Sequence, residues 1–317
     1  MLLTCLAALQ PLFADEAFDR AIEHLERMSA AMTQMDYQGT FVYVQGQQVE
    51  TMRITHVVDE QGIHERLVTR GGSQREIIRD ASGVRWIAND TQAVMQDPSL
   101  SRSYFPEISP NAILEASAQY HIALGGQEAQ AGRMGRKLSI RPRDEYRYGY
   151  TLWLEEPSGL LLRWEIYQDS ARPIARLMFT DLRLGDDVDR TELRPSQAVN
   201  DYQMRATELP EKQEVTLAQP RWAPASIPPG FELTAHRRQD KNSPDLYQHL
   251  VYSDGIAAVS VYVEQLSGIA DPLSGLRKIG TTHAFSRHAD GLQVTVVGDV
   301  PAKTVEEMGQ AVALINR

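Results

Sequence analysis

The residues best suited to catalysis or metal binding are scattered along this sequence. The two closest histidines, His283 and His288, are five positions apart in a strand-like stretch, and an odd separation on a strand directs two side chains to opposite faces. No HExxH pattern occurs, so the histidines predict no metal site, and we expect them at the solvated surface. The eight histidines are His24, His56, His64, His121, His236, His249, His283 and His288.

Carboxylates and glycines give no stronger signal for chemistry. Paired acids occur at Glu155–Glu156, Asp186–Asp187 and Glu306–Glu307, where exposed charge is the expected role. The pairs Gly71–Gly72 and Gly125–Gly126 lack the strand–glycine–helix context of a phosphate loop, so we interpret them as turns. No GxSxG nucleophile elbow is present. The sequence therefore predicts no catalytic residue, metal or cofactor, although an enzyme stays open because catalytic groups can converge from distant positions.

Composition limits the partners of the chain. It has 317 residues, 42 acidic against 32 basic, and a formal net charge of −10. Such a balance lacks the electrostatic drive for nucleic-acid binding, so no nucleic-acid partner is expected. A hydrophobic content of 42% with 23% charged residues is typical of a folded chain. The length allows one large domain or two ordinary ones.

The first fourteen residues, MLLTCLAALQPLFA, carry no charge and are mostly apolar. This pattern resembles the hydrophobic and cleavage regions of a secretory signal, and it is too short to span a bilayer. Because the usual basic n-region is missing, we expect residues 1–14 to be a signal remnant with an upstream start codon. Cleavage after Ala14 would remove Cys5, the only cysteine, and a cysteine-free chain avoids wrong disulfides in an oxidising compartment.

Hydrophobic periodicity predicts the elements that position these residues. Apolar residues recur at steps of three and four from Phe18 to Met35, which predicts an amphipathic helix ending near Asp36. A second helix is expected over 113–124, after the start signal Ser109–Pro110. Runs with a period of two, separated by glycine turns, predict antiparallel strands over 40–45, 49–58, 63–70, 75–80, 84–89, 136–143, 148–156, 160–168 and 174–184.

A change in composition divides the chain in two. Residues 15–205 are predicted to form one large antiparallel sheet with helices against one face. Residues 206–221 are polar with scattered prolines, which is typical of a linker. Residues 222–317 carry five strand candidates and a terminal helix in which Val305, Met308, Val312 and Ile315 share a face. The expected fold class is α+β and mainly antiparallel β.

A large sheet covered by helices can enclose an apolar hollow between the two layers. Such a hollow suits a lipid tail. The candidate lining residues are bulky side chains on the predicted strands, and ordinary core packing is the alternative for each of them. They are Phe41, Tyr43, Trp86, Leu152, Leu154, Trp164, Ile166 and Phe179.

Five separated blocks carry a family resemblance over essentially the whole mature chain. They are MTQMDYQGTFVY (32–43), SIRPRDEYRYGYTLWLEEPSGLLLR (139–163), IPPGF (227–231), LVYSDGIAAVSVYVE (250–264) and VTVVGDVP (294–301). Together and in this order they resemble the MucB/RseB family of periplasmic regulators of the envelope-stress sigma factor.

This resemblance implies a fold and a function. The N-terminal domain would be an incomplete β-barrel like that of the lipoprotein carriers, with helices on its concave side, followed by a small C-terminal sheet domain. Family members bind the periplasmic region of a membrane-anchored anti-sigma factor of the MucA/RseA type and shield it from the initiating site-1 protease. Lipid or mislocalised lipopolysaccharide in the N-terminal hollow favours release. A periplasmic location and homo-oligomers are also implied.

Aromatic and apolar residues on the small C-terminal sheet are the predicted anchors for this partner, because such side chains are typical of interfaces. Ordinary core packing is the alternative for each of them. A periplasmic lipid or lipoprotein carrier is the alternative function, and such a carrier would not need residues 222–317. The predicted partner-binding residues are Trp222, Phe231, Tyr247, Tyr252, Val261 and Tyr262.

Overall fold

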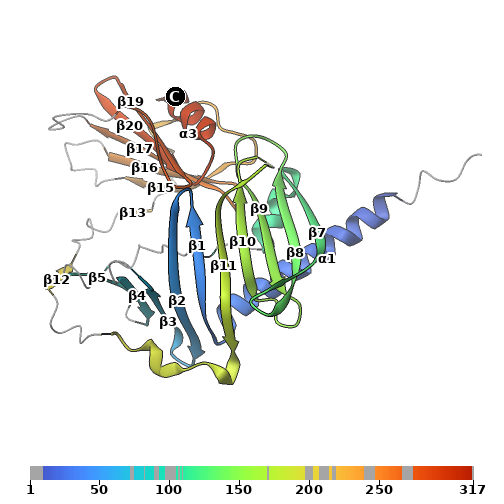
Figure 1. Ribbon diagram of the computed structural model, residues 1–317. Helices are drawn as coiled ribbons and strands as arrows, with labels where there is room; N and C mark the ends of the chain where they lie inside the picture. The colour runs from blue at the N-terminus through green and yellow to red at the C-terminus, as the bar shows by residue number, and fades with distance from the viewer. Residues whose placement is uncertain are drawn as a thin grey trace, which may run out of the picture.

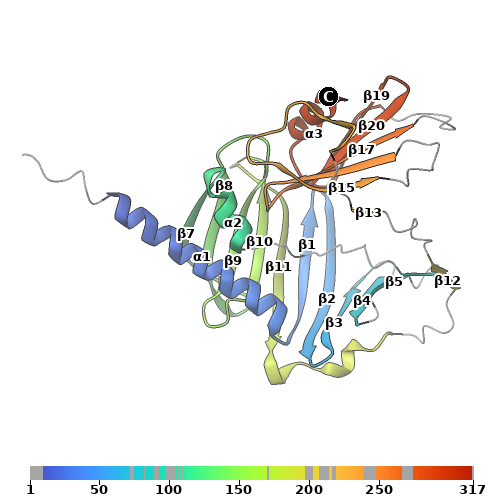
Figure 2. The same cartoon turned by 180° about the vertical axis from the view of Figure 1, so that it is seen from behind.

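A computed structural model describes most of the chain. The described residues are 10–71, 75–81, 83–88, 93–96, 105, 108, 110–169, 171–196, 203–206, 214–215, 219–238, 247–265 and 274–315. They form two large sheets that meet at one end of the first, with a long helix lying across that first sheet (Figure 1, Figure 2).

The first sheet has twelve strands in the order β12-β6-β5-β4-β3-β2-β1-β11-β10-β9-β8-β7. All neighbours are antiparallel except the β12–β6 pair. The predicted fold class is therefore confirmed. The strands are β1 (Tyr37–Gln45), β2 (Gln48–Asp59), β3 (Gly62–Thr69), β4 (Arg75–Asp80), β5 (Gly83–Ala88), β6 (Ala93–Gln96), β7 (Tyr120–Gln130), β8 (Arg133–Pro142), β9 (Gly149–Glu155), β10 (Leu161–Tyr167), β11 (Pro173–Leu184) and β12 (Gln203–Ala206).

Helix α1 (Gln10–Gln34) covers one face of this sheet (Figure 2). Its residues at steps of three and four, Ala21, Ile22, Leu25, Met28 and Ala31, are at most 7% exposed. They join the same core cluster as the inward side chains of the strands, and this burial is what holds the amphipathic helix in place.

The helix predicted over 113–124 is wrong in its second half. Helix α2 covers only Pro110–Glu115, a 3₁₀ turn follows at Ala116–Ala118, and β7 begins at Tyr120. Tyr120 and Ile122 are buried while His121 between them is exposed, which is the alternation of a strand. Gly125–Gly126 is not a turn either, because it lies inside β7 where the register with β8 shifts. This irregularity bends the strand without ending it.

The second sheet has seven strands in the order β13-β15-β16-β17-β20-β19-β18. Helix α3 (Ala302–Ala311) packs against β19 and β20 (Figure 1). The strands are β13 (Glu214–Val215), β15 (Glu232–Arg238), β16 (Tyr247–Ser253), β17 (Ala258–Gln265), β18 (Gly275–Ile279), β19 (Thr282–Ala289) and β20 (Leu292–Gly298), and a separate ribbon pairs β14 (Trp222–Pro224) with β21 (Val312–Leu314).

The terminal helix is shorter than predicted. Val305 and Met308 lie on α3 and are fully buried, but the helix ends at Ala311. Val312 then begins β21 and pairs with Pro224, and Ile315 follows that strand. The chain end is thus held by a strand pair with β14, which the helical spacing did not reveal.

The domain boundaries predicted from composition stay a prediction. Ala206 ends β12 of the first sheet, and Glu214–Val215 already pairs with β15 of the second. The predicted linker thus contributes a short strand, although 207–213 and 216–218 lie outside the described residues. Of the predicted signal remnant, 1–9 lie outside the described residues and 10–14 begin α1.

Candidate functional site at the joint between the two sheets

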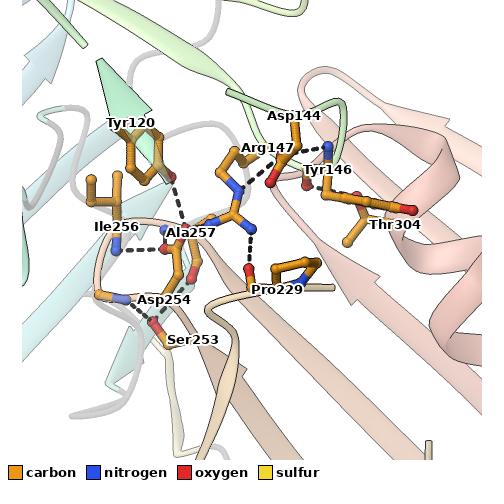
Figure 3. Close-up of polar contacts among 11 residues, drawn as sticks. Tyr120, Asp144, Tyr146, Arg147, Pro229, Ser253, Asp254, Ile256, Ala257 and Thr304 are labelled. Atoms are coloured by element: carbon orange, nitrogen blue, oxygen red, sulfur yellow. Dashed lines mark hydrogen bonds and ion pairs between the residues drawn. The ribbon is translucent and has the colours of Figure 1, made fainter. Parts of the chain in front are cut away.

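A buried ion pair joins the two sheets (Figure 3). Arg147 lies in the loop between β8 and β9, and Asp254 follows β16 of the second sheet. The Nη1 of Arg147 donates to Oδ2 of Asp254 at 2.5 Å, and both side chains are 0% exposed. We call this pair and its hydrogen-bond partners the joint.

The turn after β16 is shaped to present Asp254. Its Oδ1 accepts from the backbone N–H groups of Ile256 at 2.9 Å and Ala257 at 2.6 Å, while Oδ2 also accepts from the hydroxyl of Tyr120 at 2.9 Å. Ser253 Oγ accepts from the N–H of Gly255 at 2.9 Å. Both oxygens of the Asp254 carboxylate are therefore hydrogen-bonded where the Ser253–Gly255 turn contacts the first sheet.

Arg147 is satisfied to the same degree. Its Nη2 donates to the carbonyl oxygen of Pro229 at 2.5 Å, and its Nε donates to Oδ1 of Asp144 at 3.1 Å. The guanidinium lies over the rings of Phe231 at 4.8 Å and Tyr120 at 5.6 Å. A planar guanidinium can combine forked hydrogen bonds with ring stacking, so a lysine at this position could not reproduce these contacts.

The backbone of the turn at Gly255 lies close to helix α2 of the first sheet. Gly255 has φ +94°, a conformation that residues with a Cβ rarely adopt, and an added Cβ would come within 2.8 Å of Ala112 Cβ. Ile256 packs against the core cluster of the first sheet. A substituted residue at 255 would push the turn away from α2 and lengthen the contacts of Asp254.

A second group of contacts lies around Tyr148, next to Arg147. Its hydroxyl is 2.9 Å from the carbonyl oxygen of Thr281, 3.0 Å from that of Val300 and 3.2 Å from Nδ1 of His283. Nearby, Thr304 Oγ1 donates to the carbonyl oxygen of Tyr146 at 2.6 Å. With the contacts of Arg147 included, loop 143–148 thus contacts four separate segments, around Pro229, Asp254, Thr281 and Val300.

Tyr120 of the joint and the neighbouring Tyr148 stay protonated at any physiological pH. Burial, followed by the negative charge of Asp254, holds the pKa of Tyr120 far above its usual range. Burial likewise raises the pKa of Tyr148. Both hydroxyls are therefore permanent donors to the second sheet. The arrangement therefore holds the two sheets in position.

Sequence reasoning missed the joint. Ser253–Gly255 has turn composition, and that interpretation is correct locally, but turn composition does not reveal that Asp254 meets Arg147. The two residues are 107 positions apart. The one available signal is Arg147 itself, a charged residue between Tyr146 and Tyr148, and a single sequence does not show which way it points.

The predicted lipid-binding residues lie together in the core of the first sheet. Phe41, Leu152, Leu154, Trp164 and Phe179 are at most 4% exposed, and Tyr43, Trp86 and Ile166 pack against the same cluster. The ring of Phe105 stacks on that of Phe179 at 6.0 Å. Because these side chains fill the space beneath α1, a lipid tail would have to displace some of them, and their role in lipid binding stays a prediction.

The predicted partner-binding residues separate by strand parity. Tyr252 and Val261 point toward α3 and belong, with Trp222 and Phe231, to the core of the second sheet. Tyr262 lies on the opposite face, where it stacks on His249 with ring centroids 4.3 Å apart. The ring of Tyr247 is 6.5 Å from that of Tyr262. We call the face of the second sheet opposite α3 the open face.

The expectation of surface histidines is wrong for half of them. His56, His236, His249 and His283 are at most 8% exposed. Burial, then the nearby charge of Arg237, lowers the pKa of His249 to about 4. Among the described residues, no group of three or more metal-ligating side chains could hold a metal ion. Within the same ranges, no helix is long and apolar enough to span a membrane.

Known proteins resemble this chain over nearly its whole length. The MucB/RseB N-terminal domain family matches residues 20–197, and the MucB/RseB C-terminal domain family matches residues 216–313. Sigma factor AlgU regulatory protein MucB of Pseudomonas aeruginosa is 30% identical, covering 98% of this chain and 96% of its own. Sigma-E factor regulatory protein RseB of Haemophilus influenzae is 23% identical, covering 98% and 95%.

Solved structures agree with this relationship. A crystal structure of MucB in complex with MucA(peri) superimposes with a TM-score of 0.70 at 27% identity, covering 94% of this chain and 100% of that one. A crystal structure of MucB alone has a TM-score of 0.63 at 28% identity, with coverage of 94% and 98%.

Proposed function

The chain belongs to the MucB/RseB family, and we propose that it binds the periplasmic region of a membrane-anchored anti-sigma factor. It would thereby act in the periplasm as a negative regulator of an envelope-stress sigma factor, by binding and without catalysis. The observation that carries this proposal is the match to MucB in complex with MucA(peri), which covers 94% of the chain and includes both sheets.

We further propose that binding shields the anti-sigma factor from regulated proteolysis. The joint supports this, because a fully buried ion pair holds two sheets in one orientation and lets them act as a single surface. The open face adds half-buried aromatic side chains, Tyr247 and Tyr262, of the kind that anchor interfaces. A segment bound across such a surface is held away from a protease.

Lipid or lipopolysaccharide would favour release of the partner. This requires the lipid to bind the partner-free state more tightly, and the coupling must then be reciprocal. The joint offers a physical route: Tyr120 belongs to the core cluster of the first sheet and donates directly to Asp254. A lipid that displaces core side chains beneath α1 would disturb Tyr120 and so loosen the second sheet.

Co-elution with the purified periplasmic region of the cognate anti-sigma factor tests the proposal. We expect a complex that resists the site-1 protease and that dissociates when lipopolysaccharide is added. No protection at saturating concentration would overturn the shielding role. Lipid transfer that persists after removal of residues 222–317, without any complex, would favour a carrier instead.

A pair of tyrosine variants separates contact from folding in the same assay. Tyr262→Ala removes a side chain from the open face and should weaken the complex with little change in thermal melting. Tyr252→Ala empties a core position that is 5% exposed and should lower the melting temperature as well. Equal loss of stability in both variants would argue against the open face as a contact surface. Homo-oligomerisation stays a prediction, to be checked by size-exclusion chromatography.

A further inference from the structure

Strand β18 forms one edge of the second sheet. Residues Gly275–Ile279 pair with β19 on one side only, in the sheet of seven described strands. All five residues are exposed, and Ile279 at 83% is the most exposed of the large hydrophobic residues in the described part of the chain. An exposed edge presents unpaired backbone N–H and C=O groups, to which another extended chain can add.

The four side chains that follow Gly275 form a regular pattern on this edge. Leu276 lies opposite Phe285, whose side chain packs against the core beneath α3, so Leu276 and Lys278 point to the α3 side. Arg277 and Ile279 then point to the open face. Each side of the strand therefore carries one apolar and one basic residue, in the order apolar–basic–basic–apolar.

The charges on this edge are available to a partner. No side chain in the described ranges forms an ion pair with Arg277 or Lys278, although the whole chain has a net charge of −10. Arg176 on β11, whose Nε is 4.0 Å from Oε1 of Glu165, lines a cavity beside this edge together with Lys278 and Ile279. A local basic patch on an acidic protein selects a partner of negative charge.

The cavity beside the edge is shared by both sheets. It measures about 570 Å³, and Val44, Ile174 and Pro173 supply apolar lining from the first sheet. Gln45 Nε2 donates to Thr281 Oγ1 at 3.3 Å, and a Cβ on Gly280 would come within 2.3 Å of the Gln45 side chain. The cavity thus exists only while the β18–β19 turn stays against the first sheet, as the joint requires.

We propose that β18 binds an extended segment with the sequence pattern apolar–acidic–acidic–apolar as an added strand. Its two acidic residues would lie opposite Arg277 and Lys278, and its apolar residues opposite Leu276 and Ile279. The side chain beside Ile279 would enter the shared cavity. The pattern reads the same in both directions, so it suits parallel or antiparallel addition. This inference rests on the proposed function: the segment belongs to the periplasmic region of the anti-sigma factor.

A second copy of this chain does not fit the edge. Antiparallel pairing of β18 with itself, centred between Arg277 and Lys278, would place each basic side chain opposite a basic side chain of the other copy. Like charges directly opposite each other destabilise a strand pair, and basic residues on edge strands commonly prevent such self-association. The acidic segment removes this repulsion, which is why the occupant is a different chain.

Binding to the full chain by two probes tests the proposal. The first probe is the purified periplasmic region of the cognate anti-sigma factor, and the second is the peptide SGVEDVGS. For Arg277→Glu with Lys278→Glu we expect at least tenfold weaker binding of both probes. The peptide should slow amide hydrogen exchange at 275–279 of the unsubstituted chain. The peptide SGVKKVGS should bind the doubly substituted chain better than SGVEDVGS does.

A matched control has the same change in net charge elsewhere on the surface. Arg141 on β8 and Arg194 are exposed, and Arg141→Glu with Arg194→Glu should change the affinity by less than twofold. If both double variants bind the anti-sigma region equally well, the β18 site is wrong and the proposed function stands. If the unsubstituted chain binds the peptide at 275–279 but not the anti-sigma region, the site stands and the proposed function fails.

Two further outcomes would overturn the site. One is failure of both probes to bind the unsubstituted chain. The other is protection of amides 275–279 by phosphatidylglycerol vesicles but not by the peptide, which would identify an anionic lipid surface as the occupant. Thermal melting of both double variants should match the unsubstituted chain, so a change in binding is not a change in folding.

Discussion

The joint and the β18 edge use basic side chains in opposite surroundings. The side chain of Arg147 is 0% exposed and is held by two carboxylates, a backbone carbonyl and two aromatic rings. Arg277 and Lys278 lie on a strand whose five residues are all exposed. The comparison shows two roles for a basic side chain. Where water is excluded, it holds two sheets together, and where it is solvated, it remains available to bind a partner.

The physical reason is the cost of moving a charge out of water. A buried charge that loses its partner keeps the whole desolvation penalty, whereas an exposed charge returns to water at little cost. Substitutions in the joint should therefore reduce stability, and substitutions on the edge should reduce only binding. The size of the loss should decrease from the joint to the edge.

Loss of the Asp254 carboxylate should be the most damaging change. Asp254→Ala removes the fully buried counter-ion of Arg147, leaving only the more exposed Asp144, and removes the acceptor of Tyr120. We expect the free energy of unfolding to fall by about 3–5 kcal/mol, measured by urea denaturation. The two sheets should also separate more readily, which proteolysis near residues 206–221 would detect.

The exposed Asp186 provides the control. Asp186→Ala should change the free energy of unfolding by less than about 0.5 kcal/mol, as surface substitutions usually do. If Asp254→Ala were equally mild, the joint would not hold the sheets together, and the contrast with β18 would disappear.

Removal of the Tyr148 hydroxyl, next to the joint, should have a smaller effect. Tyr148→Phe keeps the ring but removes the hydroxyl that lies 2.9 Å from the carbonyl oxygen of Thr281 and 3.0 Å from that of Val300. The expected loss is about 1–2 kcal/mol in the free energy of unfolding. Tyr262→Phe is the matched control, because it removes a hydroxyl from a half-buried tyrosine on the open face. A loss of equal size in both variants would contradict the special role of Tyr148.

Local alternation predicted much of the fold correctly. The runs over 40–45 and 160–168 are rich in aromatic and branched apolar residues, and they form β1 and β10 within a few residues. The stretch after Pro110 failed because its composition suits a helix, while Tyr120 and Ile122 gain more by entering the sheet core. Strand β18 was missed because an edge strand that is exposed on both faces shows no apolar alternation.

Contacts between segments that are distant along the chain could not be predicted from the sequence. The apolar residues predicted as a lipid site do share one cluster, because bulky residues on inward strand positions must meet. Parity separates Tyr252 from Tyr262, but which face is covered depends on α3, and the paired register of β16 and β17 was needed to decide it. The joint depends on a contact between two loops, for which a single sequence carries no periodic signal.

His249 lies between the two extremes, on the open face but largely buried by Tyr262. Its pKa of about 4 is below the ordinary value of 6.5. The unfolded chain therefore binds a proton between those values that the folded chain does not. Stability should be unaffected above pH 6.5 and should fall, by about 3 kcal/mol, as the pH drops toward 4.

The variant His249→Gln isolates this contribution. The pKa of His56 is also lowered by burial, and its effect remains in both proteins. The difference between their free energies of unfolding should therefore shrink as the pH falls from 6.5 to 4. A constant difference over that range would show that His249 is as freely solvated as the β18 edge.

The smallest effect on stability should come from the edge itself. Arg277→Ala and Lys278→Ala should each change the free energy of unfolding by less than about 0.5 kcal/mol, because neither side chain has an ion-pair partner among the described residues. Arg147→Ala should cost several times more by the same urea titration. If the edge variants were as unstable as Arg147→Ala, the basic residues of β18 would be serving the fold, and their availability to an acidic strand would have to be abandoned. Edge variants that keep their stability but no longer bind the acidic peptide would instead show that burial decides whether a basic residue stabilises the fold or binds a partner.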